Sequence, residues 1–119
     1  MKIQGRQLIL KSGSVELENP AEDILEIQDR YVVLFLDERY ERTDPRRERN
    51  IVGLDFNGEM LWRIQRTPSA RKDLDGNRMP NPYVALEMES GELLAYDVGG
   101  ICWTVDPETG AVSDPIFTR

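Results

Sequence analysis

The sequence contains no histidine, and this absence narrows the chemistry open to the protein. Histidine is the usual general base near neutral pH, the commonest metal ligand and the partner of serine and cysteine nucleophiles. Those catalytic systems are therefore excluded. We expect a protein that is not an enzyme, with no catalytic residue, no cofactor-binding residue and no metal site.

Cysteine is almost as scarce. Cys102 is the single cysteine, so the chain has no internal disulfide framework and is compatible with a reducing compartment. No His or nearby Lys is placed to activate its thiol. The sequence predicts that Cys102 is a small buried residue next to Trp103.

Long hydrophobic runs are missing as well. The short run Gln7–Leu10 is too brief for the apolar core of a secretory signal. No segment approaches the roughly 18 apolar residues of a membrane span. We therefore expect a cytoplasmic protein without a membrane partner.

Basic residues are absent from two long segments. The net charge is −7, from 15 Lys and Arg against 22 Asp and Glu. Residues 16–29 carry Glu16, Glu18, Glu22, Asp23, Glu26 and Asp29, and residues 79–118 carry Glu87, Glu89, Glu92, Asp97, Asp106, Glu108 and Asp114, with no Lys or Arg in either segment. This balance argues against nucleic-acid binding, which normally needs a basic footprint. The acidic segments either keep the protein soluble or meet a basic partner.

What the chain does contain is period-two alternation over 119 residues, which indicates a single all-β domain, residues 1–119. Turn signals at Asn57-Gly58, Ser90-Gly91 and residues 106–110 separate short strands, and both residues of Asn57-Gly58 tolerate positive φ. Residues 20–29 fit a helix or a strand, and we favour a short turn followed by a strand. The predicted fold is a mainly β antiparallel meander of about eight to nine short strands, arranged as a sandwich, a half-propeller-like sheet or an open barrel.

An internal repeat accounts for most of these strands. Three pairs of segments overlay in the same order: Tyr31–Asp37 on Tyr83–Glu89, Asn50–Asp55 on Glu92–Asp97, and Met60–Ile64 on Ile101–Val105. The repeat units span about residues 31–65 and 83–106. They differ mainly in their loops, and the turn before the Trp is one residue shorter in the second unit. The pattern predicts a duplicated three-stranded unit.

The third strand of each unit predicts the core. Alternate side chains of a strand share a face, which groups Met60, Trp62 and Ile64 in the first unit. The same spacing groups Ile101, Trp103 and Val105 in the second. A large ring at the centre of such a face anchors one sheet against another.

The stretch LDFNGEMLW, residues 54–62, resembles the repeat of the pyrroloquinoline-quinone-type β-propellers, and VDPETGAV, residues 105–112, resembles the start of a further turn of that kind. The resemblance implies a strand–turn–Trp hairpin. A propeller needs 4–8 blades, and this chain has room for about two. The resemblance therefore implies no closed propeller and no quinone-binding residue.

A second resemblance involves NIVGLDFNGEMLWRI, residues 50–64, and WTVDPETGAV, residues 103–112. These segments resemble small bacterial immunity proteins of polymorphic toxin systems. The resemblance implies a protein that neutralises a basic toxin domain encoded nearby, by occluding its active site with an acidic surface. The predicted partner-binding residues are Glu16, Glu18, Glu22, Asp23, Glu26, Glu87, Glu89, Glu92, Arg39, Tyr40, Arg46 and Arg47.

The last four of these residues belong to an Arg-rich loop, residues 38–50, that is either a self-paired solvated loop or a contact arm. The Pro-rich linker, residues 66–82, is predicted to wrap the surface between the repeat units, either as a bland loop or as a contact segment. Within it, Asp73–Asn77 matches the first half of a calcium loop without its distal Glu, so a polar turn is expected.

An alternative function is a small-ligand or carbohydrate-binding β module in which Trp62, Trp103, Tyr83 or Tyr96 lines a pocket. Buried tryptophans would argue against it. A hydrolase that uses paired carboxylates such as Glu87 and Glu89 is disfavoured, because nothing in the sequence supplies a cleft around them.

Overall fold

The computed structural model describes residues 2–11, 13–35, 40–41, 43–68 and 71–116. It is an all-β structure of short antiparallel strands, with one 3-10 helix, η1 (Pro45–Glu48), in the described part of the chain. The strands are β1 (Lys2–Gln4), β2 (Gln7–Leu10), β3 (Gly13–Glu16), β4 (Ala21–Ile27), β5 (Arg30–Phe35), β6 (Ile51–Asp55), β7 (Met60–Arg63), β8 (Arg71–Lys72), β9 (Arg78–Met79), β10 (Tyr83–Glu89), β11 (Glu92–Asp97), β12 (Cys102–Val105) and β13 (Val112–Ile116).

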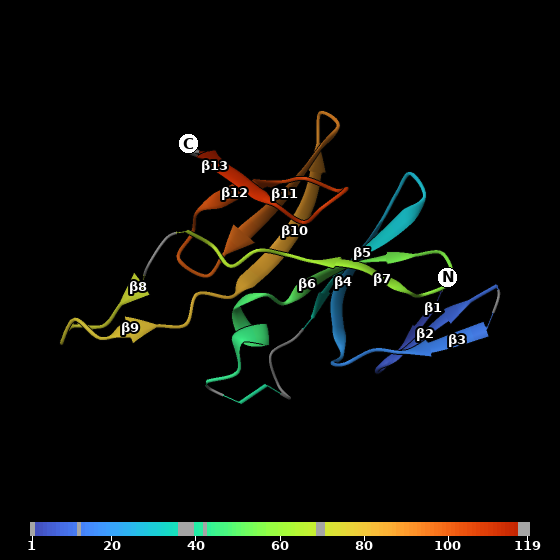
Figure 1. Ribbon diagram of the computed structural model, residues 1–119, viewed down its shortest axis with the longest axis horizontal. Helices are drawn as coiled ribbons and strands as arrows, with labels where there is room; N and C mark the ends of the chain where they lie inside the picture. Colours follow the sequence, from blue (N-terminus) through green and yellow to red (C-terminus); the bar gives the residue numbers. More distant parts are fainter. Residues whose placement is uncertain (1, 12, 36–39, 42, 69–70, 117–119) are drawn as a thin grey trace.

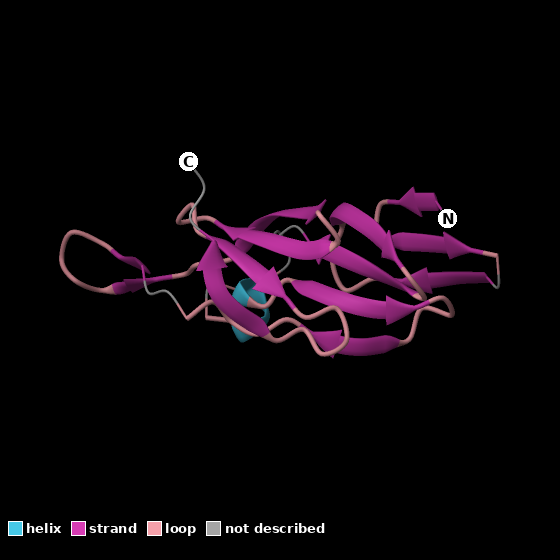
Figure 2. Ribbon diagram, turned by 90° about the horizontal axis from the view of Figure 1, so that it is seen from above, coloured by secondary structure: helices cyan, strands magenta, loops and turns pink. Residues whose placement is uncertain are grey.

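These strands form four sheets, each a simple meander (Figure 1). The N-terminal sheet is β1-β2-β3, the middle sheet is β4-β5-β6-β7, and the C-terminal sheet is β10-β11-β12-β13. The fourth, β8-β9, is a two-stranded hairpin, which we call the arm. Figure 2 shows the strands of the layers running broadly along the long axis, with the arm projecting at one end. The predicted all-β antiparallel fold is confirmed, and the sheets formed by the described residues do not close into a barrel.

Two apolar clusters hold three of the sheets together as layers. One cluster lies between the middle and C-terminal sheets, and includes Val32, Ile51 and Trp62 from the first and Leu93 and Trp103 from the second. The cluster members are nearly inaccessible to water, so folding removes almost all of their apolar side-chain surface from the solvent.

The second cluster lies between the middle and N-terminal sheets. It joins Val33, Phe35 and Val52 of the middle sheet to Leu8 and Leu10 of β2. The middle sheet is therefore covered on both faces, and this explains why every residue of β5 is buried. A strand covered on both faces reads as a continuous apolar run, as Arg30–Phe35 does after its first residue.

The repeat units occupy different places in their sheets. The first unit supplies strands two to four of the middle sheet, β5, β6 and β7, whereas the second supplies strands one to three of the C-terminal sheet, β10, β11 and β12. Strand pairing also corrects the overlay of the first strands. Val32 lies opposite Gly53 and Leu86 lies opposite Ala95, so Val32 corresponds to Leu86 rather than to Val84. This shift of two residues preserves the alternation of faces, which is why the sequence pattern did not reveal it.

The predicted face of Met60, Trp62 and Ile64 is wrong at Met60. Met60 pairs with Leu54 and Trp62 pairs with Gly53, so a β-bulge leaves Leu61 as the extra residue and breaks the alternation there. Met60 is 53% exposed, whereas Trp62 and Ile64 are buried. The bulge absorbs the extra residue that distinguishes the first turn from the second.

The turns also differ from expectation. Asn57-Gly58 does join β6 to β7, but only Gly58 has a positive φ, and the Gly58 N–H donates to the Asp55 carbonyl across a three-residue loop. The two-residue turn with positive φ at both positions is Ser90-Gly91. The acid-rich segment 20–29 contains strand β4, as favoured. Sequence reasoning missed the short strands β1, β8 and β9.

No helix in the described part of the chain is long and apolar enough to cross a membrane. Cys102 is a buried free thiol, as predicted. Burial raises its pKa despite an opposing hydrogen bond with Tyr96.

Candidate functional site

The first strands of the two large meanders, β4 and β10, lie side by side, and both are at an edge of their sheets. Neither strand contains Lys or Arg. The fold therefore brings the two acidic segments of the sequence together, although some 60 residues separate them. We call this surface the acidic edge.

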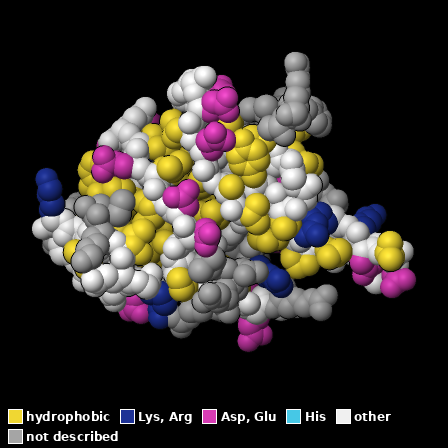
Figure 3. Space-filling model, turned by 180° about the vertical axis from the view of Figure 1, so that it is seen from behind, with side chains coloured by type: hydrophobic (Ala, Val, Ile, Leu, Met, Phe, Trp, Pro, Cys, Tyr) yellow, Lys and Arg dark blue, Asp and Glu magenta, His cyan; other side chains and the backbone are white. Residues whose placement is uncertain are grey.

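Five of the predicted contact residues are exposed on or next to these strands: Glu22, Glu26, Glu87, Glu89 and Glu92. Seen from behind (Figure 3), acidic side chains stand in the middle and upper part of this face among hydrophobic patches, with Lys and Arg to the sides and below. Glu89 and Glu92 are direct partners across the β10–β11 turn. Like charges placed opposite one another are destabilising, so this surface is suited to a cationic partner.

Both strands carry a β-bulge at their second residue. In β4, Ala21 pairs with Phe35 and Asp23 pairs with Leu34. The two partners are consecutive residues of β5, so Glu22 is the extra residue. Val84 is the extra residue in β10 by the same count. A bulge twists an edge strand and re-aims its side chain, and here both bulged residues are exposed.

Four of the predicted acids are engaged within the molecule. Glu87, on the acidic edge, accepts a hydrogen bond from the Tyr96 hydroxyl at 2.7 Å and stays exposed. Glu16 pairs with Arg6 at 2.6 Å while its side chain stays 61% exposed. Glu18 accepts hydrogen bonds from Tyr40 and Arg63 and is largely buried. Asp23 is half-buried and accepts from the N–H of Ile24. Glu18 therefore has little surface left for a partner.

The Arg-rich loop is placed only in part, because Arg39 lies outside the described residues. Tyr40 is buried, and its burial, with the hydrogen bond to Glu18, raises its pKa. Arg46 is exposed and donates to Asp44, as expected for a self-paired loop. Arg47, in η1, is half-buried. The sequence did not reveal that Tyr40 serves the interior.

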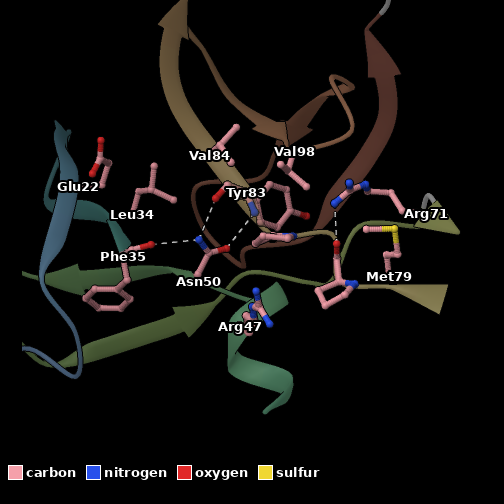
Figure 4. Close-up of a pocket in the computed structure, with 12 residues that line it drawn as sticks. Glu22, Leu34, Phe35, Arg47, Asn50, Arg71, Met79, Tyr83, Val84 and Val98 are labelled. Atoms are coloured by element: carbon pink, nitrogen blue, oxygen red, sulfur yellow. Dashed lines mark hydrogen bonds between the residues drawn. The ribbon is translucent and has the colours of Figure 1, made fainter. Parts of the chain in front are cut away.

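A groove of about 440 Å³ opens beside the acidic edge, where the two meanders meet the arm (Figure 4). Its lining comes from β4 and β5 on one side, from β10 and the turn after β11 on another, and from the base of the arm: Glu22 and Leu34, Val84 and Val98, and Arg71 and Met79. Arg47 also lines it. Figure 4 shows Glu22 at one end and Arg71 at the other. The groove is thus mainly apolar with opposite charges at its two ends.

Asn50 fixes the geometry of this groove. Its side-chain amide donates to the carbonyls of Phe35 (3.1 Å) and Tyr83 (2.8 Å), and its carbonyl accepts from the N–H of Tyr83 at 3.0 Å. The side chain therefore joins the end of β5 to the start of β10 across the two sheets. Such a fully satisfied buried amide specifies one arrangement of the strands. Sequence reasoning missed Asn50, because a lone Asn before a strand gives no signal.

A second polar network attaches the arm to the same region. Glu48 accepts two hydrogen bonds from Arg78 of β9 and one from the N–H of Asn81. Asn81 in turn donates to the buried carboxylate of Asp97, which also accepts from the indole N–H of Trp103 at 2.9 Å. The arm is therefore tied to η1 and to the C-terminal sheet through charged and amide groups.

The aromatic residues expected to line a ligand pocket are mostly in the core. Trp62 and Trp103 are buried, and the Trp62 indole N–H donates to the carbonyl of Pro107. Of the four named aromatics only Tyr83 lines the groove, and its hydroxyl donates to the carbonyl of Gln65. Burial, with the charge of Asp97, raises the Tyr83 pKa. In the described residues, no group of three His, Cys, Asp or Glu is placed to hold a metal ion.

Comparison with known proteins gives a family without an assigned activity. No curated protein and no solved structure matches the chain. Residues 1–117 match the family described as a domain of unknown function (DUF7957). The chain therefore belongs to the DUF7957 family.

Proposed function

We propose that this protein is a non-enzymatic binding module that recognises a basic protein surface through its acidic edge. The observation that carries the proposal is the placement of β4 and β10 side by side, with exposed carboxylates and no basic residue on either strand. Two segments distant in sequence supply neighbouring edge strands whose charged side chains are all acidic. Such a surface attracts a cationic partner and accelerates encounter.

The bulges support contact through side chains rather than through strand addition. A regular edge strand can pair with a strand of another chain. The extra residues Glu22 and Val84 interrupt the pairing pattern near the start of both edge strands. The acidic side chains remain available, and the backbone edges are poor templates for a partner strand.

The most specific form of this proposal is an immunity-type protein that occludes the active site of a basic toxin domain encoded nearby. The basis is the resemblance of residues 50–64 and 103–112 to such proteins, together with the acidic edge. A rigid layered scaffold suits occlusion, because little flexibility is lost on binding. Glu22, Glu26, Glu87 and Glu89 are the proposed contacts, and the Arg-rich loop is less suited because Tyr40 is buried and Arg46 is paired with Asp44.

The test uses the protein encoded by the adjacent gene as the probe. Association is measured by biolayer interferometry at low and at high salt. The double variant Glu87→Lys with Glu89→Lys should lower the association rate by roughly ten-fold to a hundred-fold at low salt. The loss should shrink at high salt, because exposed charges are then screened.

The matched control places two charge reversals elsewhere. Glu41→Lys with Glu59→Lys changes the net charge by the same amount at exposed positions outside β4 and β10. This control should retain most of the rate. An equal loss in both double variants would show a general charge effect, and the absence of any complex at low salt would contradict the proposal.

A further inference from the structure

Three turns of this molecule have the same backbone construction. They differ in how far the rest of the protein covers the apolar residue that each turn carries. The turns begin at Asp55, Asp73 and Asp97, and each has the pattern Asp-x-x-Gly. In each, the Gly N–H donates to the Asp carbonyl at 3.0 Å, and the Asp N–H donates to the carbonyl of the residue after the Gly at 2.9 Å. Each Gly has a positive φ of 82–92°, which a side chain would oppose.

The residue after the Asp is apolar in all three turns. Phe56 contacts the ring of Tyr31, with centroids 4.9 Å apart, and is 43% exposed. Val98 lines the groove and is 42% exposed. Leu74 is 106% exposed, so nothing in its own molecule covers it. Each of the three turns therefore presents an apolar side chain at the surface. Among the three, Leu74 is the one that no other part of the protein covers.

Leu74 lies at the tip of the arm, which projects from one end of the molecule (Figures 1 and 2). The tip is ordered by its own hydrogen bonds, because Asp73 accepts from the N–H groups of Asp75 and Asn77 at 2.9 Å. The base is held by Arg78 on Glu48 and by the bond from Arg71 to the Pro80 carbonyl at 2.8 Å. Leu74 is thus presented on a pre-organised support, which lowers the cost of binding.

The groove at the base of the arm has an apolar lining and a positive charge that suit this tip. Its lining is mainly apolar, as at Val84, Val98 and Met79, and Arg71 stands at one end. The contact of Arg71 with the Pro80 carbonyl is neutral and leaves its positive charge in place. The tip offers a leucine between two carboxylates, Asp73 and Asp75. The tip of the arm and the groove are therefore complementary in both polarity and charge.

We propose that two copies of this chain associate reciprocally, with Leu74 of each copy seated in the groove of the other. The tip cannot reach the groove of its own molecule, because the groove lies at the base of the same arm. In a two-fold pair of antiparallel arms, the tip of one arm lies beside the base of the other, where the groove is. A two-fold arrangement also closes on itself instead of growing into a filament. This inference goes beyond the proposed function and does not depend on it.

Sedimentation velocity of the purified full chain, from low micromolar to the highest attainable concentration, tests the proposal. The wild type should form dimers as concentration rises. Leu74→Asp should weaken the dimer about 100-fold, because it removes two buried leucines and each contributes about ten-fold. Met60→Asp is the matched control, since Met60 is 53% exposed on β7, and it should dimerise like the wild type.

Exchanging two charges distinguishes a loss of recognition between the two copies from a loss of structure in the arm. Arg71→Glu should weaken the dimer, and the double variant Arg71→Glu with Asp75→Lys should restore it, because the opposite charges then meet in exchanged positions. A loss of structure alone would not be restored. The proposal is overturned if the wild type is monomeric throughout, if Leu74→Asp dimerises normally, if Met60→Asp weakens the dimer equally, or if the double variant stays as weak as Arg71→Glu.

Discussion

The two repeat units have similar strands but different surroundings. In the first, β5 lies second in its sheet, between β4 and β6, and both of its faces are covered. In the second, β10 is an edge strand whose outer face meets solvent at Glu87 and Glu89. Val33 and Glu87 show the contrast best, because they hold corresponding positions opposite Val52 and Leu94.

The position of a strand among the three layered sheets, rather than the repeated hairpin itself, therefore decides whether its side chains pack in the core or face the solvent. The first copy is enclosed by the N-terminal and C-terminal sheets and supplies packing. One face of the second copy is not covered by another sheet, and the carboxylates of Glu87 and Glu89 lie on that face. The part of the acidic edge that β10 contributes is therefore found on the copy that lies outermost.

The largest expected effect comes from giving the first copy the residue of the second. Val33→Glu places a carboxylate where the side chain is fully buried, so we expect a loss of about 4 kcal/mol or more in the free energy of unfolding. The reverse change, Glu87→Val, acts at an exposed position and should leave stability close to that of the wild type. Urea denaturation of both variants checks the pair. Equal losses would remove the distinction between the two copies.

The next effect concerns the small residue opposite each Trp, Gly53 for Trp62 and Ala95 for Trp103. A Cβ on Gly53 would lie 2.4 Å from Cε2 of Trp62, and a Cβ on Gly110 would lie 2.5 Å from Cε3 of the same ring. Gly53→Ala should cost about 2–4 kcal/mol, because the added methyl group overlaps a buried ring that already lies against the backbone of Gly110. The matched change Ala95→Gly removes only a methyl group and should cost about 1 kcal/mol. Thermal unfolding gives both values, and a smaller loss for Gly53→Ala than for Ala95→Gly would contradict the packing described.

The smallest effect is at the attachment of the arm, which belongs to neither copy. Burial alone would raise the Glu48 pKa, but the hydrogen bonds from Arg78 and the Asn81 N–H outweigh it, so the pKa lies below its usual 4.5. A depressed pKa stabilises the fold above the unfolded value and loses that contribution as the pH falls through the folded value. Glu48→Gln should therefore cost about 1–2 kcal/mol at neutral pH.

The pH series supplies the control for this prediction. The difference in unfolding free energy between the wild type and Glu48→Gln should be constant at neutral pH and should shrink below pH 4.5. A difference that stays constant down to the acid transition would show that the charge of Glu48 contributes nothing.

The sequence predicts the strands and their pairing well, because alternation and turn residues are local signals. It predicts Trp62 and Trp103 as core residues for the same reason. It fails at Met60, where a bulge breaks the alternation, and at the first strand of the repeat, where a shift of two residues leaves the pattern unchanged. Bulges and registers depend on the partner strand, which a single segment does not specify.

The candidate site was less accessible from the sequence than the fold. The acidic segments are visible in the composition, but their meeting on β4 and β10 depends on how the sheets stack. Asn50 and the Arg78–Glu48 pair join segments about 30 residues apart, and no local motif marks them. Glu18 and Tyr40 look like surface residues until their contacts with each other and Arg63 are seen.

Amide hydrogen exchange followed by NMR tests the central claim most directly, namely that one copy is enclosed and the other lies outermost. The amides of β5 and β6 should exchange slowest, because they lie within the sheet that is covered on both faces. The amides of β10 should exchange faster, and those of the arm fastest. Protection of β10 equal to or greater than that of β5 would contradict the account.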